Sequence, residues 1–157
     1  MHARRRRLAR SLSVAGALLA LAACEQTTPN VTVYSGGTSL NDRAYSFCFE
    51  GQDPAAEPAA EGACRYDTDR QPEVLTVRPG DEVLVDVDKD LADASWFAAL
   101  RVEGEPAQRT ALQDEHTTRV QPDFNRGAPQ FLEVRKLASE AEDAAVLGLW
   151  VFTLVPG

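Results

Sequence analysis

The sequence has few of the side chains that bind transition metals. Its 157 residues include two histidines, three cysteines and one methionine. Met1 and His2 open the chain, and His116 is the other histidine. A blue-copper site needs two histidines, a free cysteine and usually a methionine, and catalytic zinc needs three protein ligands, mostly histidine or cysteine. The sequence therefore argues against both, and we expect no metal and no cofactor.

Motifs for nucleophilic catalysis are also missing. The sequence has no Gly-x-Ser-x-Gly, no serine three residues before either lysine, and no glycine-rich phosphate loop. His116 could pair with a distant serine, because triads do not follow sequence order, but its polar context DEHTTR is typical of a solvated strand edge. Some pair among 24 acids would always suit glycoside hydrolysis. A hydrolase using carboxylates or His116 is therefore the alternative to a non-catalytic protein.

The chain lacks an apolar run long enough to span a bilayer. Residues 1–23 contain a basic head, an apolar run from about residue 12 and a small-residue ending, which is the order of an export signal. The run stops after about a dozen residues, whereas a spanning helix needs about 20. The ending Leu21-Ala22-Ala23-Cys24 resembles a bacterial lipobox, which implies cleavage after residue 23 and lipid on Cys24. A secreted protein with a spare cysteine is the alternative.

Lipid on Cys24 would hold the protein on the extracytoplasmic face of the cell membrane. Each buried methylene contributes about 0.8 kcal/mol, so two or three acyl chains anchor a protein almost permanently. Residues 24–30 would then form the lipidated cysteine and a polar tether, and 31–157 a single domain. The basic head, with Arg5-Arg6-Arg7, suits both the Sec and the twin-arginine export routes.

Positive charge is scarce in the expected mature chain. Residues 24–157 carry 11 basic and 24 acidic side chains, a formal charge of −13. Charge of this sign opposes binding to phosphate backbones and to anionic headgroups. We expect no nucleic acid partner, and contact with the membrane only through the lipid.

The two remaining cysteines, Cys48 and Cys64, form an even pair in an expected exported chain, so a disulfide is predicted. It would close a loop of 17 residues, for which chain entropy predicts about 3 kcal/mol of stabilisation. Residues 52–62 inside the loop are rich in Pro, Ala and Glu. A reactive dithiol is the alternative, but it would more typically show Cys-x-x-Cys spacing.

Strand signals recur at the spacing of an all-β fold, with turn residues between them. In the stretch 81–88, valines 83, 85 and 87 fall on one face and acids on the other, the alternation of a half-buried strand. The predicted architecture is an immunoglobulin-like or cupredoxin-like antiparallel β-sandwich of about seven to nine strands. The predicted strands cover residues 31–35, 44–51, 63–67, 73–79, 81–88, 95–104, 116–121, 130–138 and 146–155.

Two tryptophans are large enough to fill the space between the sheets. Trp150 lies in the stretch 146–155, which is apolar on both faces and therefore predicts a central strand covered on both sides. We expect Trp150 in the core. Trp96 follows the acids Asp90 and Asp93 near a strand start, so core and an exposed ligand platform are both open for it.

The spacing of Asp86, Asp88 and Asp90 imitates the start of a calcium loop. Such a loop needs glycine at its sixth position and glutamate at its twelfth, but Leu91 and Phe97 stand there. On a strand, Asp86 and Asp88 would point to solvent along one face instead of surrounding an ion. A weak calcium site at Asp90 and Asp93 remains the alternative use.

The whole pattern resembles a family of small actinobacterial lipoproteins that is catalogued as a domain of unknown function. The resemblance rests on the lipobox, the two cysteines around a variable loop, and the stretches VTVYSGGTS, LTVRPGDEVLVDVDKDLADASW and LGLWVFTLV. It implies a Gram-positive surface lipoprotein and no particular activity. We expect a non-catalytic module that binds a protein or an envelope component through its loops. The alternatives are the envelope hydrolase and a solute-binding accessory lipoprotein.

Overall fold

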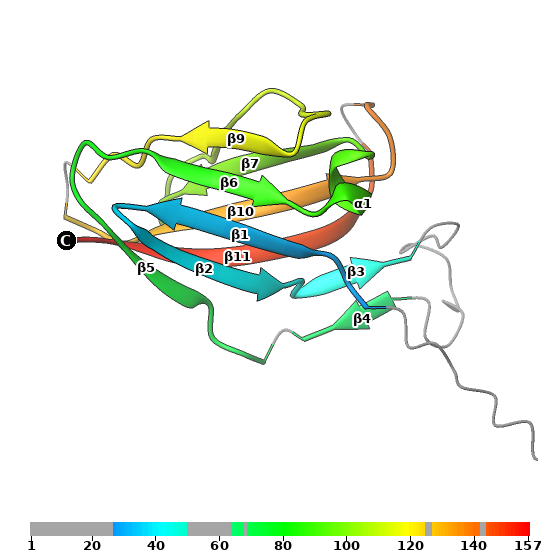
Figure 1. Cartoon of the computed structure of the whole chain (residues 1–157), viewed down its shortest axis with the longest axis horizontal. Coiled ribbons are helices and arrows are strands. Elements are labelled where there is room, and N and C mark those ends of the chain that lie inside the picture. The colour runs from blue at the N-terminus through cyan, green and yellow to red at the C-terminus, as the bar shows by residue number, and fades with distance from the viewer. Residues whose placement is uncertain (1–26, 50–63, 68, 125–126, 142–143) are drawn as a thin grey trace, which may run out of the picture.

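Figure 1 shows two β-sheets stacked face to face in the computed structural model, which describes residues 27–49, 64–67, 69–124, 127–141 and 144–157. This confirms the predicted all-β sandwich. The elements are β1 (Asn30–Ser35), β2 (Thr38–Arg43), β3 (Ser46–Cys48), β4 (Cys64–Tyr66), β5 (Glu73–Val77), β6 (Val83–Val87), α1 (Lys89–Ala92), β7 (Trp96–Arg101), β8 (Gln108–Arg109), β9 (Thr117–Val120), β10 (Gln130–Leu137) and β11 (Val146–Pro156).

The smaller sheet has the order β2-β1-β6-β9, and all its pairs are antiparallel. Its inward side is valine-rich: Val83, Val85 and Val87 of β6 are buried, as the alternation in the sequence predicts. Residues of β1 continue the same layer, with Val31 opposite Val87 and Val33 opposite Val85. The larger sheet lies behind this layer in Figure 1.

The larger sheet has seven strands in the order β4-β3-β11-β10-β7-β8, with β5 also paired to β11. The pairing of β5 with β11 is parallel, and the other pairs are antiparallel. The central position predicted for residues 146–155 is therefore confirmed. Burial on both faces is wrong: Trp150, Phe152 and Leu154 are fully buried, whereas Leu149 and Val151, on the opposite face, stay half-exposed.

The described residues contain eleven strands, two more than the upper end of the predicted range, and one short helix. The additional strands are β2, whose polar sequence TSLNDR gives no apolar alternation, and β8, which is two residues long. Helix α1 follows Asp88 and buries Leu91 and Ala92. No helix in the described part of the chain has the length and apolar content needed to cross a membrane.

The two ends of the sandwich differ. Residues 27–29 lead into β1 at one end, called here the N-terminal end, where β3, β4 and α1 also lie. Strand β11 finishes at the other, C-terminal end, together with the connections 78–82, 102–107 and 121–129. The first of these connections turns at Gly80, whose φ of +91° suits glycine.

Candidate functional site

Of the three cysteines with a predicted role, the structure describes Cys48 and Cys64. Cys24 lies outside the described residues. Cys48 and Cys64 form the expected disulfide, with a Cα–Cα distance of 4.1 Å, and it joins the paired strands β3 and β4. Cys48 is buried, so this bond sits against the body of the domain.

Trp96 does not provide an exposed ligand platform. Its side chain is 0% exposed, and its indole Nε1–H donates to the backbone oxygen of Glu115 at 3.0 Å. The preceding acids are misleading because Asp90 lies in α1 and Asp93 caps the end of that helix, before β7 carries the chain into the core. Trp96 is therefore a core residue.

Trp150 is in the core, as predicted. It is 0% exposed, its indole Nε1–H donates to the oxygen of Pro29 at 3.1 Å, and its ring meets Phe47 edge-on at 6.0 Å. This hydrogen bond ties the start of β1 to the central strand of the larger sheet.

The acids and the histidine that the sequence suggested for chemistry make hydrogen bonds and ion pairs within the fold. Asp88 accepts a hydrogen bond from the backbone N–H of Asn30 at 2.8 Å, and Asp93 is paired with Lys89. His116 is exposed, with Nδ1 3.2 Å from the backbone oxygen of Val87. Across the described ranges, no three His, Cys, Asp or Glu side chains converge as metal ligands would.

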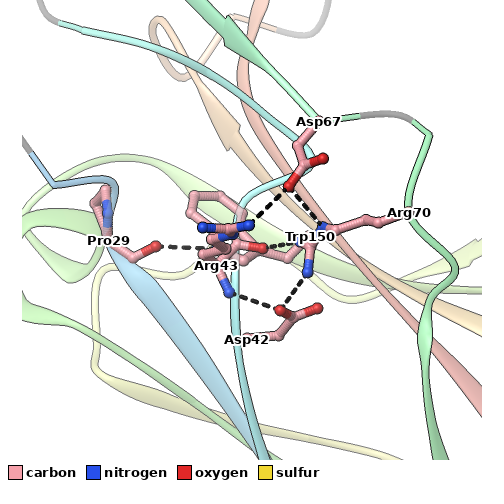
Figure 2. A network of polar contacts seen from close by, with 6 residues as sticks. All are labelled: Pro29, Asp42, Arg43, Asp67, Arg70 and Trp150. Carbon is pink, nitrogen blue, oxygen red and sulfur yellow. Dashed lines mark hydrogen bonds and ion pairs between the residues drawn. The ribbon is translucent and has the colours of Figure 1, made fainter.

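A polar cluster that the sequence did not reveal closes the edge of the sandwich between β2 and β5 (Figure 2). Asp42 points inward from β2, opposite Val31, and is 7% exposed. Arg70, in the connection between β4 and β5, reaches Asp42 Oδ1 with Nη1 at 2.5 Å and donates from Nη2 to the backbone oxygen of Arg43. The same guanidinium lies 4.0 Å above the ring of Tyr45.

Asp67 completes this cluster. Its Oδ2 lies 3.1 Å from Arg43 Nη2 and 3.5 Å from Arg70 Nε. The second contact is an ion pair without hydrogen-bond geometry, because Arg70 Nε has no hydrogen-bond partner. The backbone N–H of Asp67 also donates to the oxygen of Tyr45, so β4 is tied to the start of β3.

The three buried side-chain atoms that lack a hydrogen-bond partner, among the residues described, all belong to this cluster: Asp42 Oδ2, Tyr45 OH and Arg70 Nε. Burial raises the pKa of the Tyr45 phenol above its usual value of 10.0; the charge of Arg70 offsets part of this rise. The cluster joins the two sheets.

Three clefts lie at the C-terminal end of the sandwich. A cleft of about 120 Å³ opens between the connection 102–107 and the residues Asp123 and Ala128, with Gln108 and Gln130 in its wall. It shares Asp123 with a cleft of about 390 Å³ beside Pro79 and Gly80. It also shares Val102 and Ala128 with a third, of about 430 Å³, which includes Phe131. The three therefore adjoin one another across this end.

The walls of these clefts contain prolines, glutamines and the acids Glu103, Glu105 and Asp123. Prolines 79, 106, 122 and 129 supply rigid apolar surface, and glutamine amides supply hydrogen-bond donors and acceptors. His116 lies away from them, since it precedes β9, whose other end leads into the 121–129 connection. Serine and cysteine nucleophiles are absent from the cleft walls described above.

The chain was compared with known protein families, curated proteins and solved structures. No curated protein and no solved structure matches the chain. Residues 24–136, well over half of the sequence, match the family described as "Protein of unknown function (DUF2771)". The chain therefore belongs to the DUF2771 family.

Proposed function

We propose that this protein is a lipid-anchored, non-catalytic binding module on the extracytoplasmic face of the cell membrane. Its ligand would be a protein or another envelope component, met through the clefts at the C-terminal end of the sandwich. The family carries no assigned activity, so the proposal depends on this chain's own residues. The resemblance to actinobacterial lipoproteins adds a Gram-positive envelope as the setting.

The anchor is supported by the lipobox at residues 21–24 and by the order of the segment before it. The family match also starts at Cys24, as a mature chain would. Strand β1 begins at Asn30, so at most about 3.5 Å per residue the short connection from Cys24 keeps the domain within roughly 20 Å of the lipid. A tether this short directs the N-terminal end of the sandwich toward the membrane.

The position of the clefts carries the binding proposal. All three adjoining clefts lie at the end opposite the start of β1. They would therefore face away from the membrane, where an envelope ligand can reach them. Loops held on a rigid sandwich are a common place for binding residues.

Hydrogen–deuterium exchange of the purified lipoprotein tests the binding proposal. Cell-wall fragments and a solubilised envelope-protein fraction would be added as separate probes. We expect one of them to slow exchange in residues 102–107 and 121–124, with residues 38–43 of β2 as the internal control. If neither probe protects these connections, the binding proposal is wrong.

The hydrolase alternative needs a separate assay. Release of soluble fragments from purified cell wall would be measured for the wild type and for His116→Ala. We expect no release by either protein. Release by the wild type would replace the binding module by an enzyme; its loss in His116→Ala would assign the activity to His116, and its persistence would assign it to carboxylates.

The anchor has its own test. In Cys24→Ser the thiol that accepts the lipid is absent, so we expect the protein to leave the membrane fraction and appear in the medium. Radiolabelled palmitate should label the wild type and not the variant. Equal membrane association of both proteins would remove the anchor from the proposal.

A further inference from the structure

The outward side of the larger sheet, called here the back face, combines apolar and basic side chains. Strand pairing places its residues in rows. One row runs Arg101, Phe131, Thr153, Val74. The next runs Arg109, Ala99, Glu133, Val151, and a third runs Phe97, Arg135, Leu149, Ser46, Tyr66. The arginines lie on the β7, β8 and β10 side, and the β11, β5 and β4 side is uncharged.

Charge on the back face is opposite to that of the protein as a whole. The rows above hold three arginines and one carboxylate, Glu133, which is 4% exposed. Arg101 Nε lies 2.8 Å from Glu133 Oε1 and Arg135 Nε lies 3.0 Å from Oε2, so two cations share one buried anion. Arg109 adds a third cation, above the ring of Phe97. A net positive surface therefore lies on a mature chain of charge −13.

Exposed apolar side chains concentrate on the same side. Among the described residues five large hydrophobic side chains are exposed. Tyr66 (65%) and Val74 (56%) stand in the rows of the back face, and Val146 continues it beside Leu137. Leu112 lies next to Phe97 and Arg109. Only Tyr34 belongs to the smaller sheet.

We propose that the back face docks a second, different envelope protein through an acidic and partly apolar surface of that partner. Three exposed or half-exposed arginines select carboxylates, and the uncharged half buries apolar area, as in known interfaces with an apolar centre and Arg at the rim. The proposal concerns a different surface from the clefts at the C-terminal end. It relies on the proposed anchor for the partner's location only.

Two other occupants fit the back face less well. A second copy of the chain placed face to face would offer these arginines one carboxylate in the rows, Glu133, which is buried and already paired with Arg101 and Arg135. A bilayer would meet Leu149, Val151 and Thr153, which are half-buried in the central strand β11. The face also runs along the strands, whereas β1 begins at the end of the sandwich, so the anchor would leave the face perpendicular to the membrane.

Photo-crosslinking of the full-length protein in the cells that produce it tests the proposal. p-Benzoylphenylalanine would replace Tyr66 or, separately, Val74 on the back face, and Tyr34 as the matched control on the smaller sheet. We expect one protein adduct of discrete mass from the two back-face positions and none from Tyr34. Mass spectrometry should place the crosslink in an acid-rich extracytoplasmic peptide of another protein.

Charge reversal supplies the second readout. Arg109→Glu should lower the adduct yield about tenfold, because it places a carboxylate against the partner's acids, and Arg109→Lys should restore most of it. Arg119→Glu, on the exposed side of the smaller sheet, is the control and should leave the yield unchanged. Unchanged thermal unfolding of each variant shows that folding is not the cause.

Other results would overturn the proposal. These are adducts with lipid or with a second copy of the chain, equal yields from Tyr34, no adduct at either back-face position, or a yield that Arg109→Glu does not change. Loss of the anchor is distinguishable from these outcomes, because Cys24→Ser moves the whole protein without altering the back face.

Discussion

Arg70 joins the two sheets through contacts that few other residues could make. Its planar guanidinium reaches the Asp42 carboxylate, the Arg43 carbonyl and the face of the Tyr45 ring at once. Asp42 lies on an outer strand and points inward, an arrangement that discourages pairing with another chain. The cost of this buried carboxylate is offset only while Arg70 is present.

Replacing Arg70 by Met should therefore destabilise the domain strongly. Asp42 would keep a buried charge with no cation beside it and only the backbone N–H of Arg43 as a donor, a change that costs about 3 kcal/mol in buried pairs. The free energy of unfolding in urea measures this. The double variant Asp42→Leu/Arg70→Met should recover most of the loss, because it removes the charge as well. A loss below about 1 kcal/mol in the single variant would show that the pair is not effectively buried.

Tyr45 gives a prediction in alkaline solution. Because its pKa is raised in the folded protein, the folded state holds the phenol proton more tightly than the unfolded chain does. Below about pH 10 the phenol is neutral in both the folded and the unfolded state, and the free energy of unfolding does not depend on its ionisation. As the pH rises from there through the higher folded pKa, the unfolded chain loses the proton first and the free energy of unfolding falls. Tyr45→Phe should lack this part of the alkaline loss. An identical alkaline profile for both proteins in chemical denaturation would contradict the prediction.

The same variant should not lose stability at pH 7. It removes a buried hydroxyl that has no hydrogen-bond partner, and removing such a group is nearly neutral or stabilises by about 1 kcal/mol. Tyr34→Phe, at an exposed position, is the matched control and should change little at either pH.

Single residues were predictable from the sequence where local pattern decides their position. The inward valines of β6 and the core position of Trp150 follow from alternation and from an apolar run. The core position of Trp96 did not follow, because the short helix α1, which contains Asp90 and is capped by Asp93, precedes it and gives no apolar alternation. Asp42 and Arg70 are 28 residues apart, and no local pattern indicates such a contact.

Strands β3 and β4 form a short two-stranded ribbon that a disulfide holds together. Each has three residues, and one of their three residue pairs is the Cys48–Cys64 pair itself. Arg43 and Arg70 hold Asp67 just after β4, so the ribbon is fixed on both sides. Replacing both cysteines by serine should lower the free energy of unfolding by about 3 kcal/mol, which is the value that chain entropy predicts for a loop of about 15 residues.

Urea denaturation of the oxidised wild type and of Cys48→Ser/Cys64→Ser measures that loss. The reduced wild type is the control and should match the variant within error. Equal unfolding midpoints for the oxidised protein and the variant would mean that the polar contacts around Asp67 suffice to hold the ribbon.

Elements with strong alternation were predictable, whereas strand β2 and the register of β5 were not. Strand β2 is an outer strand whose side chains are mostly exposed, so its sequence has no apolar side to detect. Strand β5 was predicted, but its parallel partner β11 lies about 80 residues away. Register between such distant segments depends on the assembled core.

At the scale of the whole molecule, β11 connects most of the larger sheet. It pairs with β10 along most of its length on one side, and with β3 and β5 on the other. It also supplies Trp150, Phe152 and Leu154 to the core. A chain that ends at residue 145 should therefore not fold. Limited proteolysis and circular dichroism would check this, and a protease-resistant domain without residues 146–157 would contradict it.

The sandwich architecture was predictable because strand spacing and composition are global properties of the sequence. The clefts and the back face were not. Both are made by residues from several strands and connections, and the charge of the back face is opposite to the overall charge that the sequence displays. Surface function of this kind depends on how the sheets are assembled.

The late position of β11 in the chain also determines when the protein can fold. A chain that emerges from a channel with its N-terminus first exposes β3, β5 and β10 before their shared partner β11 exists. No half of the chain contains a complete larger sheet, and pairings this distant in sequence form slowly. If the protein is exported, it crosses either wholly unfolded or wholly folded. The Cys48–Cys64 bond, which belongs to oxidising compartments, fits folding after the crossing.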